Sequence, residues 1–130
     1  MATMAVLVVA LLVACGGRNG DDSASGTPDA APVEADGAVT MQLISFKPEA
    51  LTVDAGTTVR WTQKDAGVHT VTSGTVEQAG GGVAKMPDGR FDSGELATAR
   101  TFTFTFDRPG TYPYFCSVHP ATMRGEVRVR

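Results

Sequence analysis

The chain has 130 residues, the length of one ordinary domain, and a formal net charge of −3 at pH 7. Residues 16–37 carry one arginine against five acids, a charge of −4, which leaves the remainder of the chain at +1. Nucleic-acid binding requires a clustered basic face, which this balance does not offer. The composition therefore excludes a nucleic-acid partner and predicts a single small domain.

The N-terminus has the pattern of an export signal, which we assign to residues 1–14. Residues 5–14 form an apolar run that suits a signal-peptide core and is too short to span a bilayer. The run ends in L-V-A-C, which resembles the lipobox of bacterial lipoproteins and implies cleavage after residue 14 and a lipid on Cys15. The alternative is an ordinary secretory signal that is cut nearby. Both alternatives predict an exported protein.

Residues 15–37 are expected to form a flexible tether. From Gly16 to Gly37 the only branched aliphatic residue is Val33, and no residue is aromatic. Such a segment cannot bury enough apolar surface to become ordered. The folded domain is therefore expected at residues 38–130, as a monomer.

From Ala38 onward the residues alternate with period two between turn residues, and no helical period is sustained. Strands are expected at 39–46, 51–53, 57–62, 69–72, 100–106, 111–116 and 125–129. Seven to eight short strands in about ninety residues predict an all-β fold, an antiparallel Greek-key β-sandwich.

Pro113 predicts an edge position or an unbonded amide within strand 111–116. Residues Tyr112, Tyr114 and Cys116 of this strand share a face toward the core.

Residues 74–90 are glycine-rich but lack the spacing of a phosphate loop. We expect a long variable loop there, with room for a short helical turn.

The run Y-F-C-S-V-H-P-A-T-M at residues 114–123 presents a thiol, an imidazole and a thioether directly after a strand. The second histidine of the chain, His69, lies about fifty residues upstream, at the end of another strand-like segment. Two imidazoles, a thiolate and a weak thioether are the donors of a blue-copper electron-transfer site. Alone, Cys116 and Met123 would equally suit a core. A lone thiol in an oxidising compartment is also prone to oxidation unless it is engaged, and binding to a metal ion would engage it.

These motifs and their flanks resemble the cupredoxins, the small blue copper proteins of the plastocyanin, amicyanin and pseudoazurin group. The resemblance covers about residues 39–130, most specifically H-T-V at 69–71 and G-T-Y-P-Y-F-C-S-V-H-P at 110–120, with F-D-S-G at 91–94. It implies one copper ion per chain, with His69, Cys116 and His119 as ligands and Met123 as the long axial contact. Met86 is the alternative sulfur.

The resemblance also assigns roles around the metal. In the family an asparagine commonly follows the first histidine and bridges to the residue after the cysteine. Here Thr70 and Ser117 occupy these positions, and we expect their hydroxyl groups to form the bridge. Pro120 and Ala121 beside His119 are the expected electron-transfer patch.

The expected function is one-electron transfer between redox partner proteins at the outer face of a membrane, periplasmic or otherwise extracytoplasmic. Copper storage or delivery is the alternative, although such proteins favour labile Met- or Cys-rich sites and the five methionines here are scattered. Copper oxidases and nitrite reductases need further histidines, and a dinuclear site needs a second loop cysteine. We therefore expect no enzyme activity. A metal-free binding module is the remaining alternative.

Overall fold

The computed structural model describes residues 36–130. The expected signal peptide, Cys15 and nearly all of the tether lie outside the described residues. The described part contains nine strands and no helix, so it contains no helix that could cross a membrane. The strands are β1 (Gly37–Met41), β2 (Phe46–Lys47), β3 (Ala50–Val53), β4 (Thr57–Gln63), β5 (Thr72–Ala79), β6 (Gly82–Asp92), β7 (Thr101–Phe106), β8 (Gly110–Phe115) and β9 (Arg124–Val129).

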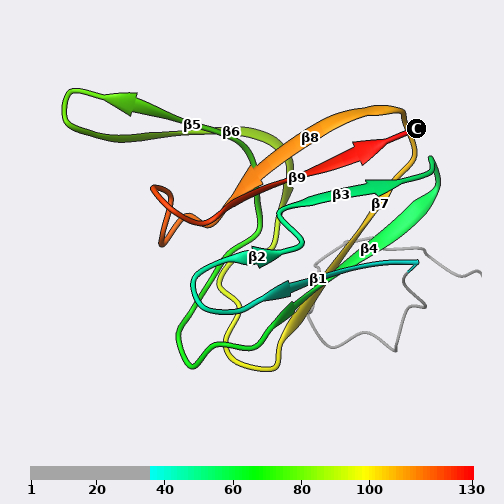
Figure 1. The fold of residues 1–130 in the computed structure, drawn as a ribbon, viewed down its shortest axis with the longest axis horizontal. Helices are drawn as coiled ribbons and strands as arrows, with labels where there is room; N and C mark the ends of the chain where they lie inside the picture. The colour runs from blue at the N-terminus through cyan, green and yellow to red at the C-terminus, as the bar shows by residue number, and fades with distance from the viewer. Residues whose placement is uncertain (1–35) are drawn as a thin grey trace, which may run out of the picture.

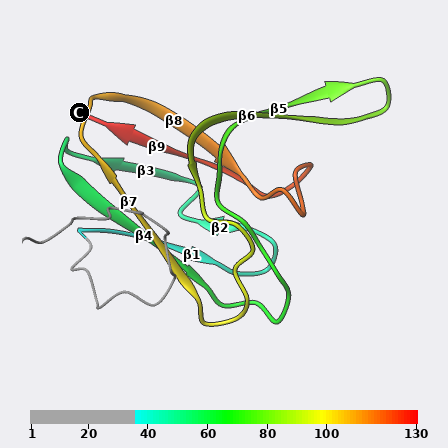
Figure 2. The ribbon, with the colours of Figure 1, turned by 180° about the vertical axis from the view of Figure 1, so that it is seen from behind.

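The strands form two sheets, with the orders β2-β1-β4-β7 and β3-β9-β8-β5-β6, as Figures 1 and 2 show from opposite sides. The sandwich is confirmed, but the purely antiparallel pairing is wrong. Strands β1 and β4 pair in parallel, and so do β3 and β9. After β2 the chain crosses to the other sheet as β3 before it returns as β4, and parallel neighbours require such a crossover.

The core lies between the sheets and is centred on Trp61 of β4, which is fully buried. Its ring contacts the rings of Phe102, Phe106, Phe91 and Tyr114 at centroid distances of 5.5 to 6.3 Å. Such aromatic pairs stabilise a core beyond the area that they bury. Tyr114 comes from the opposite sheet, so this cluster joins the two layers beneath Cys116.

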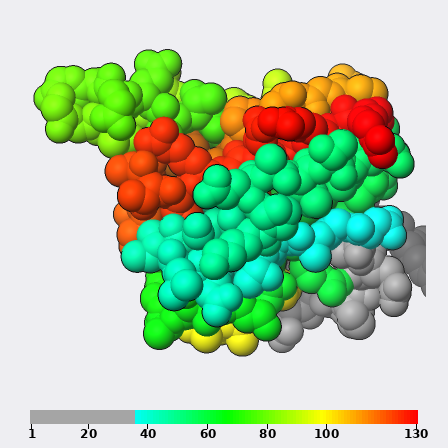
Figure 3. Space-filling model, in the orientation of Figure 1, coloured from blue at the N-terminus to red at the C-terminus, as the bar shows by residue number. Residues whose placement is uncertain are grey.

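The expectation of a loop at residues 74–90 is wrong. Strands β5 and β6 form a long hairpin, here called the arm, which projects beyond the sandwich in Figures 1 and 3. Nearly all residues from 75 to 90 are exposed or half-buried, so neither face of the arm requires apolar residues. The period-two signal of a half-buried strand is therefore missing from this stretch.

The arm separates from the sheet at Gly74 and Pro113. Strand β5 pairs with β8 only at Phe115 and Tyr114, and Pro113 lies one residue beyond these pairs. Although β8 lies between β9 and β5, only β9 pairs with it at Pro113, so this residue has the local edge position that the sequence predicts. Gly74 has a φ of 129°, and a Cβ atom there would overlap the backbone carbonyl of Met86. Only glycine fits this point, where the register between β5 and β6 shifts and the two backbones approach closely.

Candidate metal centre

The sequence-predicted ligands come together at one end of the sandwich. His69 lies between β4 and β5, where its backbone exchanges two hydrogen bonds with Leu96. Cys116 directly follows β8, and His119 and Met123 lie in the loop from Cys116 to Met123, here called the ligand loop. The Cys116 amide donates to the Met123 carbonyl at 3.0 Å, and the Met123 amide donates to the His119 carbonyl at 2.9 Å. The loop is therefore closed by its own backbone.

His69, Cys116 and His119 present three donor atoms that lie within 4.8 Å of one another. Sγ of Cys116 is 3.7 Å from Nδ1 of His69 and 3.8 Å from Nδ1 of His119. Imidazole nitrogen and thiolate sulfur bind metal ions such as zinc at about 2.0–2.3 Å, so three donors in a plane around one ion lie roughly 3.5–4 Å apart. The three donors therefore fit one ion in a trigonal arrangement, the equatorial set of a blue-copper site.

The two histidines differ in exposure. His69 and Cys116 are buried, with 1% and 0% of their surface exposed, whereas His119 is half-buried. Met123, the last residue of the ligand loop, is completely buried. Met86, the alternative sulfur, lies on the arm with 51% of its surface exposed, which does not support it as a ligand in a buried site.

A chain of hydroxyl groups connects the two segments that carry the ligands. The amide of Ser117 donates to Oγ1 of Thr70 at 2.7 Å, so Thr70 bridges to the residue after the cysteine. The hydroxyl group of Thr72 links those of Thr70 and Ser117, at 3.1 and 3.0 Å. The Thr70 amide donates to Sγ of Cys116 at 3.3 Å, which stabilises a thiolate. The sequence analysis did not include Thr72, although it lies two residues from Thr70 and would share a face with it in the strand expected at 69–72.

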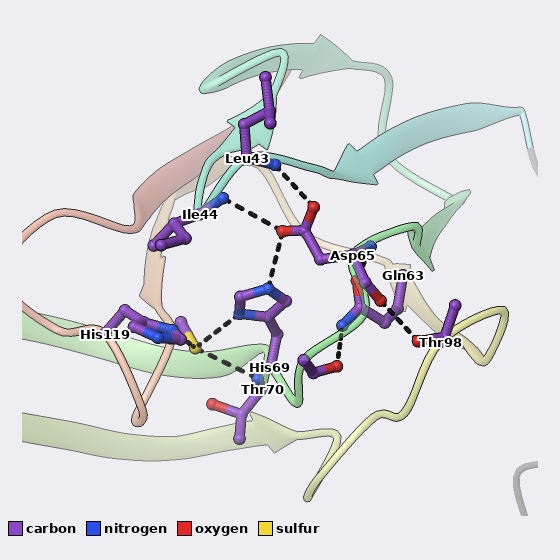
Figure 4. A network of polar contacts seen from close by, with 10 residues as sticks. Leu43, Ile44, Gln63, Asp65, His69, Thr70, Thr98 and His119 are labelled. Carbon is purple, nitrogen blue, oxygen red and sulfur yellow. Dashed lines mark hydrogen bonds and ion pairs between the residues drawn. The ribbon is translucent and has the colours of Figure 1, made fainter.

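Asp65 is a second residue that the sequence reasoning missed. Its Oδ2 atom lies 2.9 Å from Nε2 of His69, the ring nitrogen that faces away from Cys116 (Figure 4). The amides of Leu43 and Ile44 donate to the same carboxylate at 2.8 and 3.1 Å. The hydrogen bond from Leu43, followed by those from Ile44 and His69, lowers the pKa of Asp65 against the opposing effect of burial. The available signal was an acid four residues before the ligand histidine, which is weak without the fold.

The outer part of the ligand loop is held by a cation. Arg124, the first residue of β9, donates from Nε to the Pro120 carbonyl at 3.1 Å and from its guanidinium to the Ala121 carbonyl at 2.9 Å. Pro120 is half-buried and Ala121 is exposed. Both residues of the predicted electron-transfer patch thus lie on a fixed turn beside His119.

Comparisons with known proteins agree with this geometry. The family model of copper binding proteins of the plastocyanin/azurin family matches residues 33–130. Amicyanin from Paracoccus denitrificans is 34% identical over 109 residues, which cover 81% of this chain and 75% of that protein. Amicyanin-alpha from Methylorubrum extorquens is 33% identical over 91 residues, which cover 70% of this chain and 69% of that protein.

The solved structure of a purple cupredoxin from Nitrosopumilus maritimus superposes with a TM-score of 0.58 at 29% identity, covering 73% of this chain and 100% of that chain. The fold, the donor set and the sequence matches agree. The chain belongs to the plastocyanin/azurin family of small blue copper proteins, and copper is the metal that its donors fit.

Proposed function

We propose that this chain is a one-electron carrier with a mononuclear copper site, in which His69, Cys116 and His119 would hold the ion and Met123 would be a fourth, weaker ligand. The observation that carries the proposal is the trigonal set of three donors, buried on one side and half-exposed at His119. Bound copper would supply a one-electron couple. The residues keep the donors in place through backbone closure of the ligand loop and the Thr70 bridge. Little rearrangement then accompanies a change of oxidation state.

The surface around His119 supports transfer through that histidine. Large exposed hydrophobic residues of the described chain occur in the segments around the site or on the arm: Leu43, Ile44, Val68, Met86 and Val118. Val68 precedes His69, Val118 precedes His119, and the Leu43 and Ile44 amides bind the same carboxylate as His69. Exposed apolar patches commonly mark interaction sites, and small interfaces suit brief redox encounters. We include Pro120 and Ala121 in this docking patch.

Copper storage is the weaker alternative. Within residues 36–130 a single cluster of three or more potential ligands occurs, and its cysteine and one of its histidines are buried.

We also propose that the protein is exported, is anchored to a membrane by a lipid on Cys15, and acts as a monomer. Cys15→Ser should release the protein from the membrane fraction without changing the copper spectrum. A wild-type protein that is soluble without detergent would contradict the anchor.

The test of the electron-carrier function is spectroscopic and electrochemical. The copper-loaded protein should show intense visible absorption from thiolate-to-copper charge transfer, a narrow hyperfine splitting and a reversible one-electron wave. Cys116→Ser should abolish the absorption, because the thiolate is its source. Colourless, loosely bound copper in the wild-type protein would refute the proposal.

A further inference from the structure

Asp65 has a hydrogen-bond partner for every polar atom, and the partners lie in three segments of the chain, at residues 43–44, 63–69 and 98 (Figure 4). Its amide donates to Oε1 of Gln63 at 2.8 Å, and its carbonyl accepts from the hydroxyl group of Thr98 at 2.6 Å. Gln63 is fully buried and also donates from Nε2 to the Gly67 carbonyl at 2.7 Å. These contacts therefore fix the backbone of Asp65 independently of the contacts that its carboxylate makes.

The carboxylate binds a turn with an unfavourable backbone. Leu43 and Ile44 connect β1 to β2 and have φ values of 56° and 54°, the left-handed region that side chains larger than glycine rarely adopt. Their side chains are 75% and 47% exposed, so apolar burial does not compensate for this conformation. Both amides point at the Asp65 carboxylate, and successive amides in such a turn form an anion-binding concavity. The carboxylate thus stabilises the turn, together with the hydrogen bond from the Gln42 amide to the Ser45 carbonyl at 3.0 Å.

The same carboxylate determines which nitrogen of His69 is free. Because Oδ2 of Asp65 accepts from Nε2 of His69, the ring proton lies on Nε2, and Nδ1 faces Sγ of Cys116 with its lone pair. The side chain of His69 is 2% exposed and that of Asp65 is 18% exposed, so water competes weakly for this contact. A rotated ring would lose the carboxylate and turn Nδ1 away from the thiol.

We propose that Asp65 is a positioning residue of the metal centre, which holds His69 in its ligating orientation and is itself held by the left-handed turn Leu43–Ile44. The exposed apolar turn and the buried ligand therefore depend on one carboxylate. The inference rests on the proposed function for the identity of the metal, whereas the orientation of His69 belongs to the protein without metal. A carboxylate behind a ligating imidazole also increases its donor strength, which favours the cupric state.

The principal variant is Asp65→Asn, which keeps the shape of the side chain and removes the charge. Its copper form should have a more positive reduction potential than the wild type. Asp65→Glu, which retains the carboxylate, should lie closer to the wild type. Asp54→Asn is the matched control, because it removes the same charge from an exposed residue that contacts Arg130, and its potential should be unchanged.

A second measurement uses the copper-free protein, so that it stays informative if the copper site is not of the blue type. Nitrogen-15 NMR at pH 8 should show His69 of the wild type with its proton on Nε2, and the amide protons of Leu43 and Ile44 shifted strongly downfield. Asp65→Asn should lose both downfield shifts. A variant with lower stability but an unchanged potential and unchanged amide shifts would overturn the proposal. So would a wild-type His69 with its proton on Nδ1.

Discussion

Thr70→Val tests whether the hydroxyl bridge, rather than the packing of Thr70, joins the two ligand segments. The substitution keeps the shape of the buried side chain and removes Oγ1, which accepts from the Ser117 amide at 2.7 Å and contacts the Thr72 hydroxyl at 3.1 Å. Each such hydrogen bond contributes about 1 kcal/mol net, and a donor left without a partner adds to the cost. We therefore expect the free energy of unfolding of the copper-free protein to fall by about 2 kcal/mol.

The assay is urea denaturation of the copper-free protein, with thermal unfolding beside it. For a domain of about this size, 2 kcal/mol corresponds to a fall in Tm of roughly 10 °C. The visible absorption of the copper form should persist, because the Thr70 amide still donates to Sγ of Cys116.

Thr70→Ser is the matched control, because it retains the hydroxyl group and loses only a methyl group. It should retain most of the stability that Thr70→Val loses. An equal loss of stability in both variants would refute the reasoning, because packing of Thr70 would then explain the loss. A loss below about 0.5 kcal/mol in Thr70→Val would also refute it, because the hydrogen bonds of Oγ1 would then contribute almost nothing.

Three further predictions concern other parts of the molecule. Burial raises the pKa of Tyr114 to about 12, so this tyrosine ionises at a lower pH in the unfolded chain than in the folded one. The free energy of unfolding should therefore fall by about 2–3 kcal/mol between pH 10 and 12. Urea titrations at several pH values should show this dependence, and Tyr114→Phe should reduce it. Gly74→Ala should make the arm more sensitive to limited proteolysis, because its Cβ atom would overlap the Met86 carbonyl. An arm as resistant as that of the wild type would contradict this close approach of the β5 and β6 backbones. Ala121→Glu should slow electron self-exchange severalfold at an unchanged potential, and an unchanged rate would place the exit elsewhere.

The ligand residues and the sandwich were predictable from the sequence for different reasons. His69, Cys116 and His119 could be recognised because few residues of these types occur and their chemistry allows few combinations. Strands such as β4 could be recognised because they alternate between a core face and a more exposed face. The arm could not, since both of its faces are exposed and its sequence has no need to alternate. The parallel pairs could not either, because local patterns do not record which strands become neighbours.

Asp65 shows most clearly why part of the site was hidden. Its role depends on a turn more than twenty residues earlier, whose two amides approach only when β1 and β4 lie side by side. Leu43 and Ile44 also conceal the turn, because their side chains indicate a strand whereas their backbone is left-handed. The sequence around Asp65 gives no sign of its role, because its partners are backbone amides of a turn whose side chains do not indicate a turn.

The asymmetry between the two histidines connects the contacts of Asp65 to the proposed electron transfer. His69 is buried and its Nε2 atom contacts Asp65, so its side of the site is shielded from water and its ring orientation is constrained. His119 is half-buried on a loop whose outer carbonyls are bound by Arg124, so backbone contacts support its position while part of the residue stays exposed, as contact with a partner would require. One histidine thus keeps the donor geometry constant while the other opens it to the surface. A carrier requires both properties, because a rigid site lowers the cost of changing oxidation state and an exposed ligand shortens the path to the partner.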